Sequence, residues 1–230
     1  MDWNDKRLRI YIEAGLAVLL VLTLALAGAS GRLSASADDS GRRAEAVSGQ
    51  ENSTQAEQGS SQAEAVTVRE MVDYFNSSGK EYPSDQLSKG GADSIETFCQ
   101  MYYEEASAEG VRPEVAFAQT MKETGFLQYG GDASIEQFNF AGLGTTGGGV
   151  PGNSYPDVRT GIRAQIQHLK AYATSDPLAQ ECVDDRYEYV KKGAAPYVEW
   201  LGQQENPEGL GWATGDNYGY DIVNMIKDMM

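Results

Sequence analysis

Apolar residues from about residue 96 onward recur at helical spacing. Intervals of three and four residues predict helices over residues 96–108, 112–129, 160–173 and 216–229. The second of these has Pro113 near its first position and closes on Gly130 and Gly131, which are typical signals of a helix start and a helix end. Convincing alternating runs, which would predict strands, are few. The pattern therefore predicts a mainly α domain.

The N-terminus shows a different pattern. Residues 10–29 hold a single charge, Glu13, and follow Lys6, Arg7 and Arg9. A run of roughly 20 apolar residues is long enough to cross a bilayer, and the preceding cations predict that residues 1–9 stay in the cytoplasm. A cleaved signal peptide is the alternative, because the small residues at 27–29 offer a cleavage site. Both interpretations place the rest of the chain outside the cell, either attached to the membrane by one span or secreted.

Residues 30–65 differ again in composition. They are rich in Ser, Ala, Glu, Gln and Gly and contain no aromatic residue. Such a segment buries too little apolar surface to offset its ordering entropy, so it is predicted to be a flexible linker. Aromatic residues return at Tyr74 and Phe75. We therefore expect one globular domain over residues 66–230.

The charge of the chain limits its partners. The formal net charge is −16, and residues 66–230 hold 12 basic and 25 acidic side chains, which leaves −13 on the predicted domain. Nucleic acids are polyanions and would be repelled by this charge. The sequence therefore predicts no nucleic-acid partner.

The glycines at 142, 144 and 147 match the GxGxxG pattern of dinucleotide-binding turns. That pattern requires a helix to begin at its last glycine, where the helix N-terminus receives the phosphates. Here Gly148, Gly149 and Pro151 follow, and none of them favours a helix. We conclude that the match is accidental, and we expect no cofactor.

Cys99 and Cys182 are the two cysteines of the chain, and both fall in the predicted exported domain. An even pair in an oxidising compartment predicts a disulfide. His168 is the one histidine, and it lies in a helical pattern of apolar residues, which favours a packing or hydrogen-bonding role. With one histidine and no CxxC motif, the sequence predicts no metal site.

Glu123 is the strongest candidate for chemistry. Its neighbours at helical spacing are mostly apolar or uncharged: Ala116, Gln119, Thr120, Phe126 and Leu127. Desolvation raises the pKa of a carboxyl group, which keeps it protonated near neutral pH and able to act as a general acid. An ordinary surface glutamate paired with a lysine or arginine is the alternative that the spacing alone leaves open.

Four segments resemble the bacterial cell-wall glucosaminidases of glycoside hydrolase family 73. They are EVAFAQTMKETGF, FNFAGLG, SYPDVRTGIRAQIQHLKAYA and GWATGDNYGYDIVNMI, and they occur in the family's order across about residues 115–226. The resemblance implies a lysozyme-like α fold with a cleft. It also implies that the partner is the glycan strand of peptidoglycan, cut at the β-1,4 bond after N-acetylglucosamine.

The resemblance also implies roles for individual residues. Glu123 corresponds to the general acid, and Tyr218 to a tyrosine that helps to place the substrate. Asn139, Phe140 and Gly142 correspond to residues that shape the cleft. Trp200 and Trp212 are further candidates for substrate contacts, because aromatic rings stack on pyranose faces.

The chain departs from the family in one respect. Many members have a longer lobe with a second glutamate, whereas the stretch TTGGGVPGNSYP contains no acid. Glu136 and Asp157 are the nearest acids that flank it, and Asp157 also suits a helix cap. We therefore expect a substrate-assisted reaction, with Asp157 as base of an inverting reaction as the alternative. A muramidase, a lytic transglycosylase and a non-catalytic wall-binding module remain alternative functions.

Overall fold

Helices make up most of the regular structure in the computed structural model, which describes residues 7–12, 66–131, 133–145 and 148–230. The α-helices are α2 (Val68–Ser77), α3 (Ser84–Leu87), α4 (Ile95–Glu109), α5 (Pro113–Thr124), α6 (Val158–Ala173) and α7 (Tyr218–Met229). The short 3-10 helices are η1 (Ser88–Gly90), η2 (Ile135–Gln137), η3 (Tyr187–Tyr189) and η4 (Val198–Leu201). Within these residues, strand pairing is limited to isolated bridges. The predicted mainly α class is confirmed, and it is consistent with a lysozyme-like domain.

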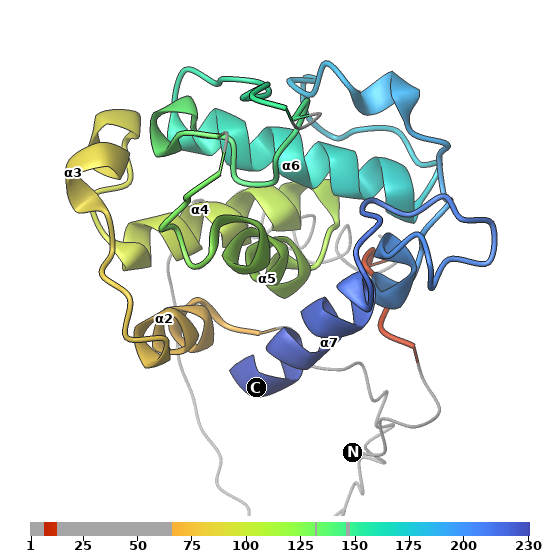
Figure 1. The fold of residues 1–230 in the computed structure, drawn as a ribbon, viewed down its shortest axis with the longest axis horizontal. Coiled ribbons are helices and arrows are strands. Elements are labelled where there is room, and N and C mark those ends of the chain that lie inside the picture. The colour runs from red at the N-terminus through yellow and green to blue at the C-terminus, as the bar shows by residue number, and fades with distance from the viewer. Residues whose placement is uncertain (1–6, 13–65, 132, 146–147) are drawn as a thin grey trace, which may run out of the picture. The chain divides into compact units, whose positions relative to one another are not determined.

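Helix α5 lies in the middle of the domain (Figure 1). It packs against α4, α6 and α7, and ten of its twelve residues are buried. A helix surrounded on nearly all sides has no wide polar face, which explains why its sequence is apolar or uncharged at most positions. Lys122 and Glu123 are the two residues of α5 that are not buried. The exposed end of this central helix is therefore the end that carries Glu123.

The largest differences from the predictions concern α5 and α2, since the other predicted helices agree to within two residues at each end. Helix α5 ends at Thr124, five residues before the predicted end, because Gly125 takes the left-handed conformation with φ 58°. Helix α2 was not predicted. It begins with a capping box in which the Thr67 side chain accepts from the Glu70 N–H and the Glu70 carboxylate accepts from the Thr67 N–H.

Residues 7–12 lie against the domain. The Ile10 N–H donates to Pro196 O at 3.1 Å, and the Arg112 N–H donates to Ile10 O at 2.8 Å. Ile10 itself is fully buried. A membrane anchor that keeps residues 1–9 in the cytoplasm would hold them on the opposite side of the membrane from an exported domain. One molecule therefore cannot have both that anchor and this contact.

The remainder of the predicted membrane segment (10–29) and the linker (30–65) lie outside the described residues and stay predictions. Among the residues that are described, no helix is both long enough and apolar enough to span a bilayer.

The predicted disulfide between Cys99 and Cys182 is wrong, since both thiols are free. Cys99 faces the core from α4 and is fully buried, and burial raises the pKa of its thiol. Cys182 is exposed on the segment after α6, where its Sγ donates to Asp184 O at 3.3 Å. The even number of cysteines carried no information about their separation in the fold.

Candidate active site

The chain turns sharply after Glu123. Phe126, Leu127 and Tyr129 all have positive φ, between 56° and 64°, which is costly for residues with a side chain. The Thr124 hydroxyl stabilises the turn, because it accepts from the Leu127 N–H at 2.8 Å and donates to Thr120 O at 2.7 Å. Strain of about 1–3 kcal/mol per residue persists only where the surroundings enforce it, and such sites are often functional.

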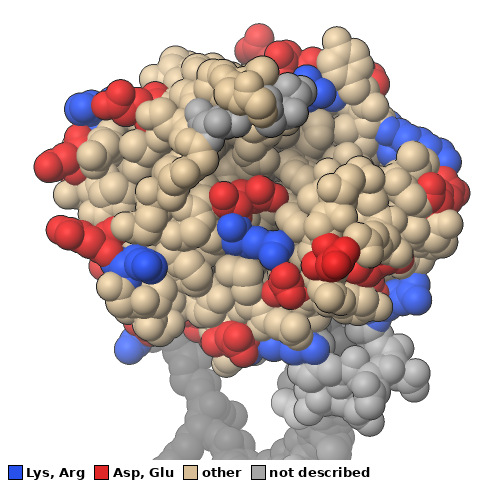
Figure 2. All heavy atoms as spheres, in the orientation of Figure 1, with Lys and Arg blue, Asp and Glu red and all other residues tan. Residues whose placement is uncertain are grey.

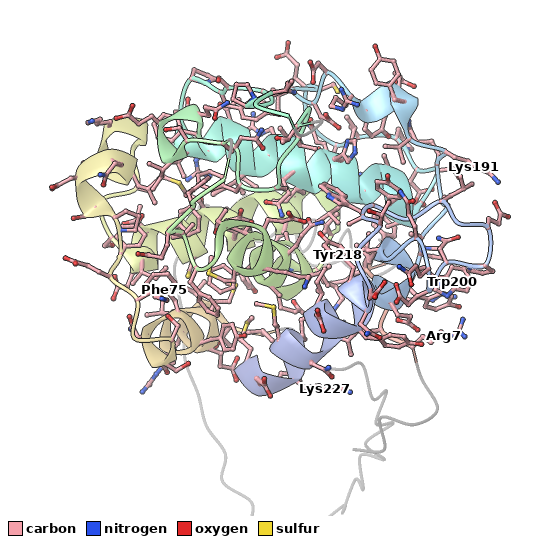
Figure 3. The ribbon with its side chains drawn as sticks, viewed as in Figure 1. Arg7, Phe75, Lys191, Trp200, Tyr218 and Lys227 are labelled. Carbon is pink, nitrogen blue, oxygen red and sulfur yellow. The ribbon has the colours of Figure 1, made fainter. Side chains whose placement is uncertain are left out.

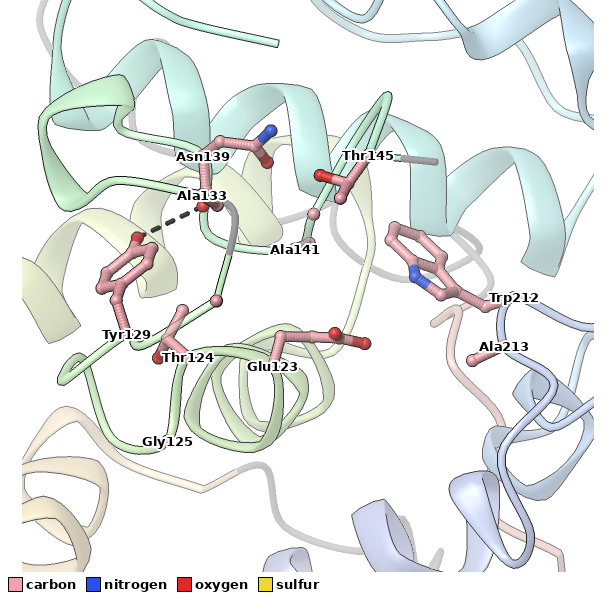
Figure 4. Close-up of a pocket in the computed structure, with 12 residues that line it drawn as sticks. Glu123, Thr124, Gly125, Tyr129, Ala133, Asn139, Ala141, Thr145, Trp212 and Ala213 are labelled. Carbon is pink, nitrogen blue, oxygen red and sulfur yellow. Dashed lines mark hydrogen bonds between the residues drawn. The ribbon is translucent and has the colours of Figure 1, made fainter. Parts of the chain in front are cut away.

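A second loop faces this turn. The Asn139 side chain closes it, with Nδ2 donating to Leu143 O at 2.8 Å and Oδ1 accepting from the Leu143 N–H at 3.0 Å. The Tyr129 hydroxyl ties the two loops together by donating to Asn139 O at 3.2 Å (Figure 4). On the far side of this loop, α6 approaches so closely that a Cβ on Gly161 would lie 1.8 Å from Phe138 O. The second loop is therefore fixed at both ends.

Two glycines of the GxGxxG region serve this loop. Gly144 and Gly152 both have positive φ, and a Cβ on either would lie within 2.6 Å of another loop atom. They allow the loop to fold back on itself, where the Asn153 N–H donates to Leu143 O at 2.8 Å. No helix begins in the described residues 148–152.

The two loops and the end of α5 enclose a pocket of about 490 Å³. Such a volume lies in the range of small-molecule sites. Figure 2 shows a hollow near the middle of the same face, with acidic and basic atoms side by side within it. The described residues that line the pocket are Glu123, Thr124, Gly125, Tyr129, Gly131, Ala133, Asn139, Ala141, Gly142, Thr145, Trp212 and Ala213. Glu123 is the one acid among them.

Helix α7 brings Tyr218 to Glu123. Tyr218 is the first residue of α7, and its hydroxyl donates a short hydrogen bond to Glu123 Oε1. The neighbouring Gly219 allows this approach, since a Cβ there would lie 2.2 Å from Glu199 O of η4. An ion pair of 2.8 Å between Lys122 Nζ and Asp221 Oδ2 adds a second link between α5 and α7. Tyr218 is 5% exposed, so its hydroxyl lies beneath the carboxyl rather than in the open pocket.

The surroundings raise the pKa of Glu123. Desolvation of the carboxyl at the pocket wall is the largest effect and raises the pKa, although the residue as a whole is exposed to solvent through the pocket. The hydrogen bond from Tyr218 and the positive charge of Lys122 act in the opposite direction and lower the pKa. Burial and the charge of Glu123 raise the pKa of Tyr218 well above its ordinary value. Tyr218 is therefore a neutral donor, and Glu123 holds its proton to higher pH than an ordinary glutamate.

Several predicted site residues meet at this pocket and others do not. Asn139, Gly142 and Trp212 line it with Glu123. Phe140, which was predicted to shape the cleft, is fully buried and packs on Phe98 at 5.1 Å, so it supports the loop from below.

Trp200 and Asp157 also lie elsewhere. Trp200 packs on Tyr197 at 4.9 Å and beneath Arg7, which Figure 3 shows beside it, and it does not line the pocket. Asp157 caps α6, with Oδ1 accepting from the Thr160 N–H at 2.7 Å, and it does not line the pocket.

Trp212 has a buried support that the sequence did not reveal. Its ring lies 4.7 Å from the ring of His168, edge to face, and 5.7 Å from that of Tyr172. His168 Nδ1 and the buried Asp184 Oδ2 are 2.7 Å apart. The predicted hydrogen-bonding role of His168 is confirmed. Asp184 is 16 residues away in sequence, and no motif pointed to it.

The sequence relationships agree with this geometry. Residues 99–230 match the glucosaminidase family, described as mannosyl-glycoprotein endo-β-N-acetylglucosaminidase. The match covers more than half of the chain and includes Glu123 and Tyr218, so the protein belongs to this family of glycoside hydrolases.

The chain is also 41% identical over 104 residues to an uncharacterized protein of Borreliella burgdorferi. The aligned segment covers 45% of this chain and 51% of that protein. The chain thus spans about half the length of the curated relative that it matches. No solved structure gives a significant match.

Proposed function

We propose that the protein is a peptidoglycan hydrolase that cleaves the β-1,4 bond after N-acetylglucosamine, with Glu123 as general acid. The position of Glu123 carries the proposal: it is the one acid among the described residues of the pocket, and partial desolvation of its carboxyl raises its pKa. Membership of the glucosaminidase family supports the type of bond and the glycan substrate. A pocket lined by Trp212 and small residues suits the flat face of a pyranose ring.

In the proposed reaction, protonated Glu123 donates its proton to the glycosidic oxygen as the C1–O bond breaks. General acid catalysis of this kind is typically worth about 10²–10⁴-fold in rate. The 2-acetamido oxygen of N-acetylglucosamine attacks C1 and forms an oxazolinium ion. Glu123, now ionised, then accepts a proton from the water that opens this ring, and the product keeps the β configuration.

Substrate assistance is favoured because no second acid lines the described pocket. Standard retaining enzymes need a second carboxylate about 5–5.5 Å from the acid, and inverting enzymes need one at about 6.5–9.5 Å. Asp157 is engaged as a helix cap. Asp132 is adjacent in sequence to the lining residues Gly131 and Ala133, and it lies outside the described residues. Both acids therefore belong in the test.

The anomer formed first separates these mechanisms. The wild-type protein and the Asp157→Asn and Asp132→Asn variants are mixed with a soluble glycan strand, and NMR identifies the new anomeric centre. A β product that both variants still form supports substrate assistance. An α product that requires either aspartate makes that residue the base of an inverting reaction.

Mass spectrometry of the new chain ends in purified peptidoglycan tests the proposed bond. We expect reducing N-acetylglucosamine ends. Reducing N-acetylmuramic acid ends would indicate a muramidase, and anhydro ends would indicate a lytic transglycosylase. Binding to peptidoglycan without any new ends would indicate a wall-binding module.

The location of the domain is also a proposal. The apolar N-terminal segment and a substrate that lies outside the membrane support export to the cell surface, which requires residues 7–12 to leave their contact with the domain. Protease treatment of intact cells tests it, since an exported domain is degraded and a cytoplasmic one is protected.

A further inference from the structure

A chain of buried polar side chains runs from Glu123 through the core. It passes from Tyr218 on α7 to Gln119 on α5 and then to Gln165 on α6. Gln119 and Gln165 are fully buried and uncharged, and neither lines the pocket. A buried amide costs free energy unless each of its polar atoms has a hydrogen-bond partner. Its oxygen can only accept and its nitrogen can only donate. The hydrogen bonds along the chain of side chains are therefore expected to run in one consistent direction from donor to acceptor.

The direction is set at Gln165. Its Nε2 lies 2.9 Å from Ala116 O, and a main-chain carbonyl can only accept. Its Oε1 lies 2.7 Å from the Tyr102 hydroxyl and 2.9 Å from the Thr120 hydroxyl. Exchanging the two ends of this amide would place one oxygen against another at Ala116. The orientation of Gln165 is therefore fixed by the backbone of α5.

That orientation passes to Gln119. Gln165 Nε2 also lies 2.9 Å from Gln119 Oε1, which must accept because Nε2 carries only hydrogens. The other end of the Gln119 amide, Nε2, then points to the Tyr218 hydroxyl at 3.1 Å and donates to it. Tyr218 has one hydroxyl proton and cannot give it to a donor. Its remaining partner is Glu123 Oε1, so the proton goes there.

We propose that Gln119 and Gln165 are positioning residues that place the acidic proton of Glu123 on Oε2. Oε1 already accepts from Tyr218, so in the protonated acid Oε1 is the carbonyl oxygen and Oε2 carries the proton. Among the residues that the structure describes, Oε2 has no protein hydrogen-bond partner, and the exposed part of Glu123 faces the pocket. The inference rests on the proposed function, in which this proton is transferred to the glycosidic oxygen.

Gln119→Glu is the sharpest variant, because it keeps the size of the side chain and reverses the direction. The carboxyl at 119 still accepts from Gln165, and it now competes with Glu123 for one proton. Either the carboxyl at 119 holds that proton and donates to Tyr218, which leaves Glu123 ionised, or it is ionised and accepts from Tyr218, so that Glu123 donates its proton to the Tyr218 oxygen. In both cases Oε2 of Glu123 has no proton to transfer into the pocket. We expect kcat to fall by about 10- to 100-fold, within the range of general acid catalysis, with KM changed less than about twofold.

Two further variants separate direction from folding. Gln119→Met removes the donor without reversing the chain, and we expect a loss of a few-fold in kcat. Gln167→Met is the matched control, because Gln167 is also a fully buried glutamine of α6 but bonds Val183 N and Glu181 O instead. It is expected to lower thermal stability and leave kcat and KM unchanged.

The position of the proton is read directly by infrared spectroscopy. The carbonyl stretch of protonated Glu123 is isolated as the difference between each protein and the same protein carrying Glu123→Gln. In the wild type it lies at low frequency because Oε1 accepts from Tyr218. We expect it to move to higher frequency or to disappear in Gln119→Glu, to move little in Gln119→Met, where Tyr218 keeps Oε1 as its acceptor, and to stay in place in Gln167→Met. An unshifted band in Gln119→Glu, or a Gln119→Glu kcat within twofold of wild type, overturns the inference. These spectra need no glycan, so failure of the proposed function is seen separately, as an absence of new chain ends.

Discussion

Glu109 and Glu123 show two uses of a glutamate near a helix end. Glu109 ends α4 and is almost fully buried, with Lys170 Nζ at 2.9 Å and the Ala179 and Gln180 N–H groups donating to its two oxygens. Glu123 near the end of α5 has one oxygen held by Tyr218, and the rest of its carboxyl faces a pocket. Both oxygens of Glu109 accept hydrogen bonds from the protein, whereas Oε2 of Glu123 has no protein hydrogen-bond partner among the described residues. The difference lies in how many hydrogen bonds the protein itself supplies.

The largest expected effect is on catalysis at Glu123. Glu123→Gln keeps the acceptor for Tyr218 but cannot donate an acidic proton, so release of reducing ends should fall by about 10²–10⁴-fold. Binding of glycan strands should persist, which a pull-down on insoluble peptidoglycan measures. Activity within a few-fold of wild type would remove Glu123 from the mechanism.

Glu109→Gln should show the opposite pattern. It leaves the buried Lys170 without its charged partner, and breaking a buried pair in this way costs about 3–5 kcal/mol. Chemical denaturation should report that loss, while hydrolysis per folded molecule stays at the wild-type level. A loss of turnover without a loss of stability would contradict the structural role given to Glu109.

Gly219→Ala should disturb the site through the backbone. A Cβ at 219 would lie 2.2 Å from Glu199 O, so α7 must shift away from η4 and carry Tyr218 with it. Overpacking of this kind costs about 1–3 kcal/mol, and turnover should fall as well. Gly215→Ala is the control, because a Cβ there meets no atom within 4 Å. Equal melting temperatures and turnover for the two variants would refute this packing argument.

Tyr218→Phe should move the pH profile. The hydrogen bond from Tyr218 lowers the pKa of Glu123, so its loss raises that pKa further. The reaction needs the protonated acid, and the alkaline limb of kcat should therefore shift to higher pH as kcat itself falls. A limb that stays in place, or moves to lower pH, would show that Glu123 does not set it.

A smaller effect is expected on stability. The folded-state pKa of Glu123 is raised above its unfolded value, so the stabilisation linked to its proton is present below the unfolded pKa and is lost as pH rises through the folded pKa. Glu123→Gln removes this dependence and should melt at a higher temperature than wild type near neutral pH. The advantage should shrink in acid, and scanning calorimetry at several pH values measures it. A constant difference across pH would contradict the raised pKa.

Part of this site followed from sequence and part did not. The spacing around Glu123 and the four family segments singled it out as the candidate acid, and Tyr218 was found by its place in the last segment. Its role was anticipated less well, because sequence could not tell that its hydroxyl points at Glu123 rather than into the pocket. Gln119 was noted as an uncharged neighbour, yet the orientation of its amide, on which its proposed role rests, is set by Gln165, 46 residues away. The donor and acceptor roles of these side chains are set only when the helices pack against each other.

Local signals that were present could also be missed. The capping box of Thr67 and Glu70 predicts the start of α2, and it lay at the boundary assigned to the linker. The early end of α5 depended on one glycine followed by two bulky residues in a left-handed turn, which no propensity favours. The disulfide prediction was wrong because it rested on the number of cysteines and not on their positions in the fold.

The most direct test of the central claim varies the leaving group. Glu123→Gln is compared with wild type on natural glycan and on a chitooligosaccharide whose leaving group is an acidic nitrophenol. An acidic phenol leaves without protonation, so a variant that lacks only the general acid should release it at close to the wild-type rate in the first step, while it stays about 10²–10⁴-fold slower on glycan. An equal loss on both substrates would contradict the assignment of Glu123 as the acid.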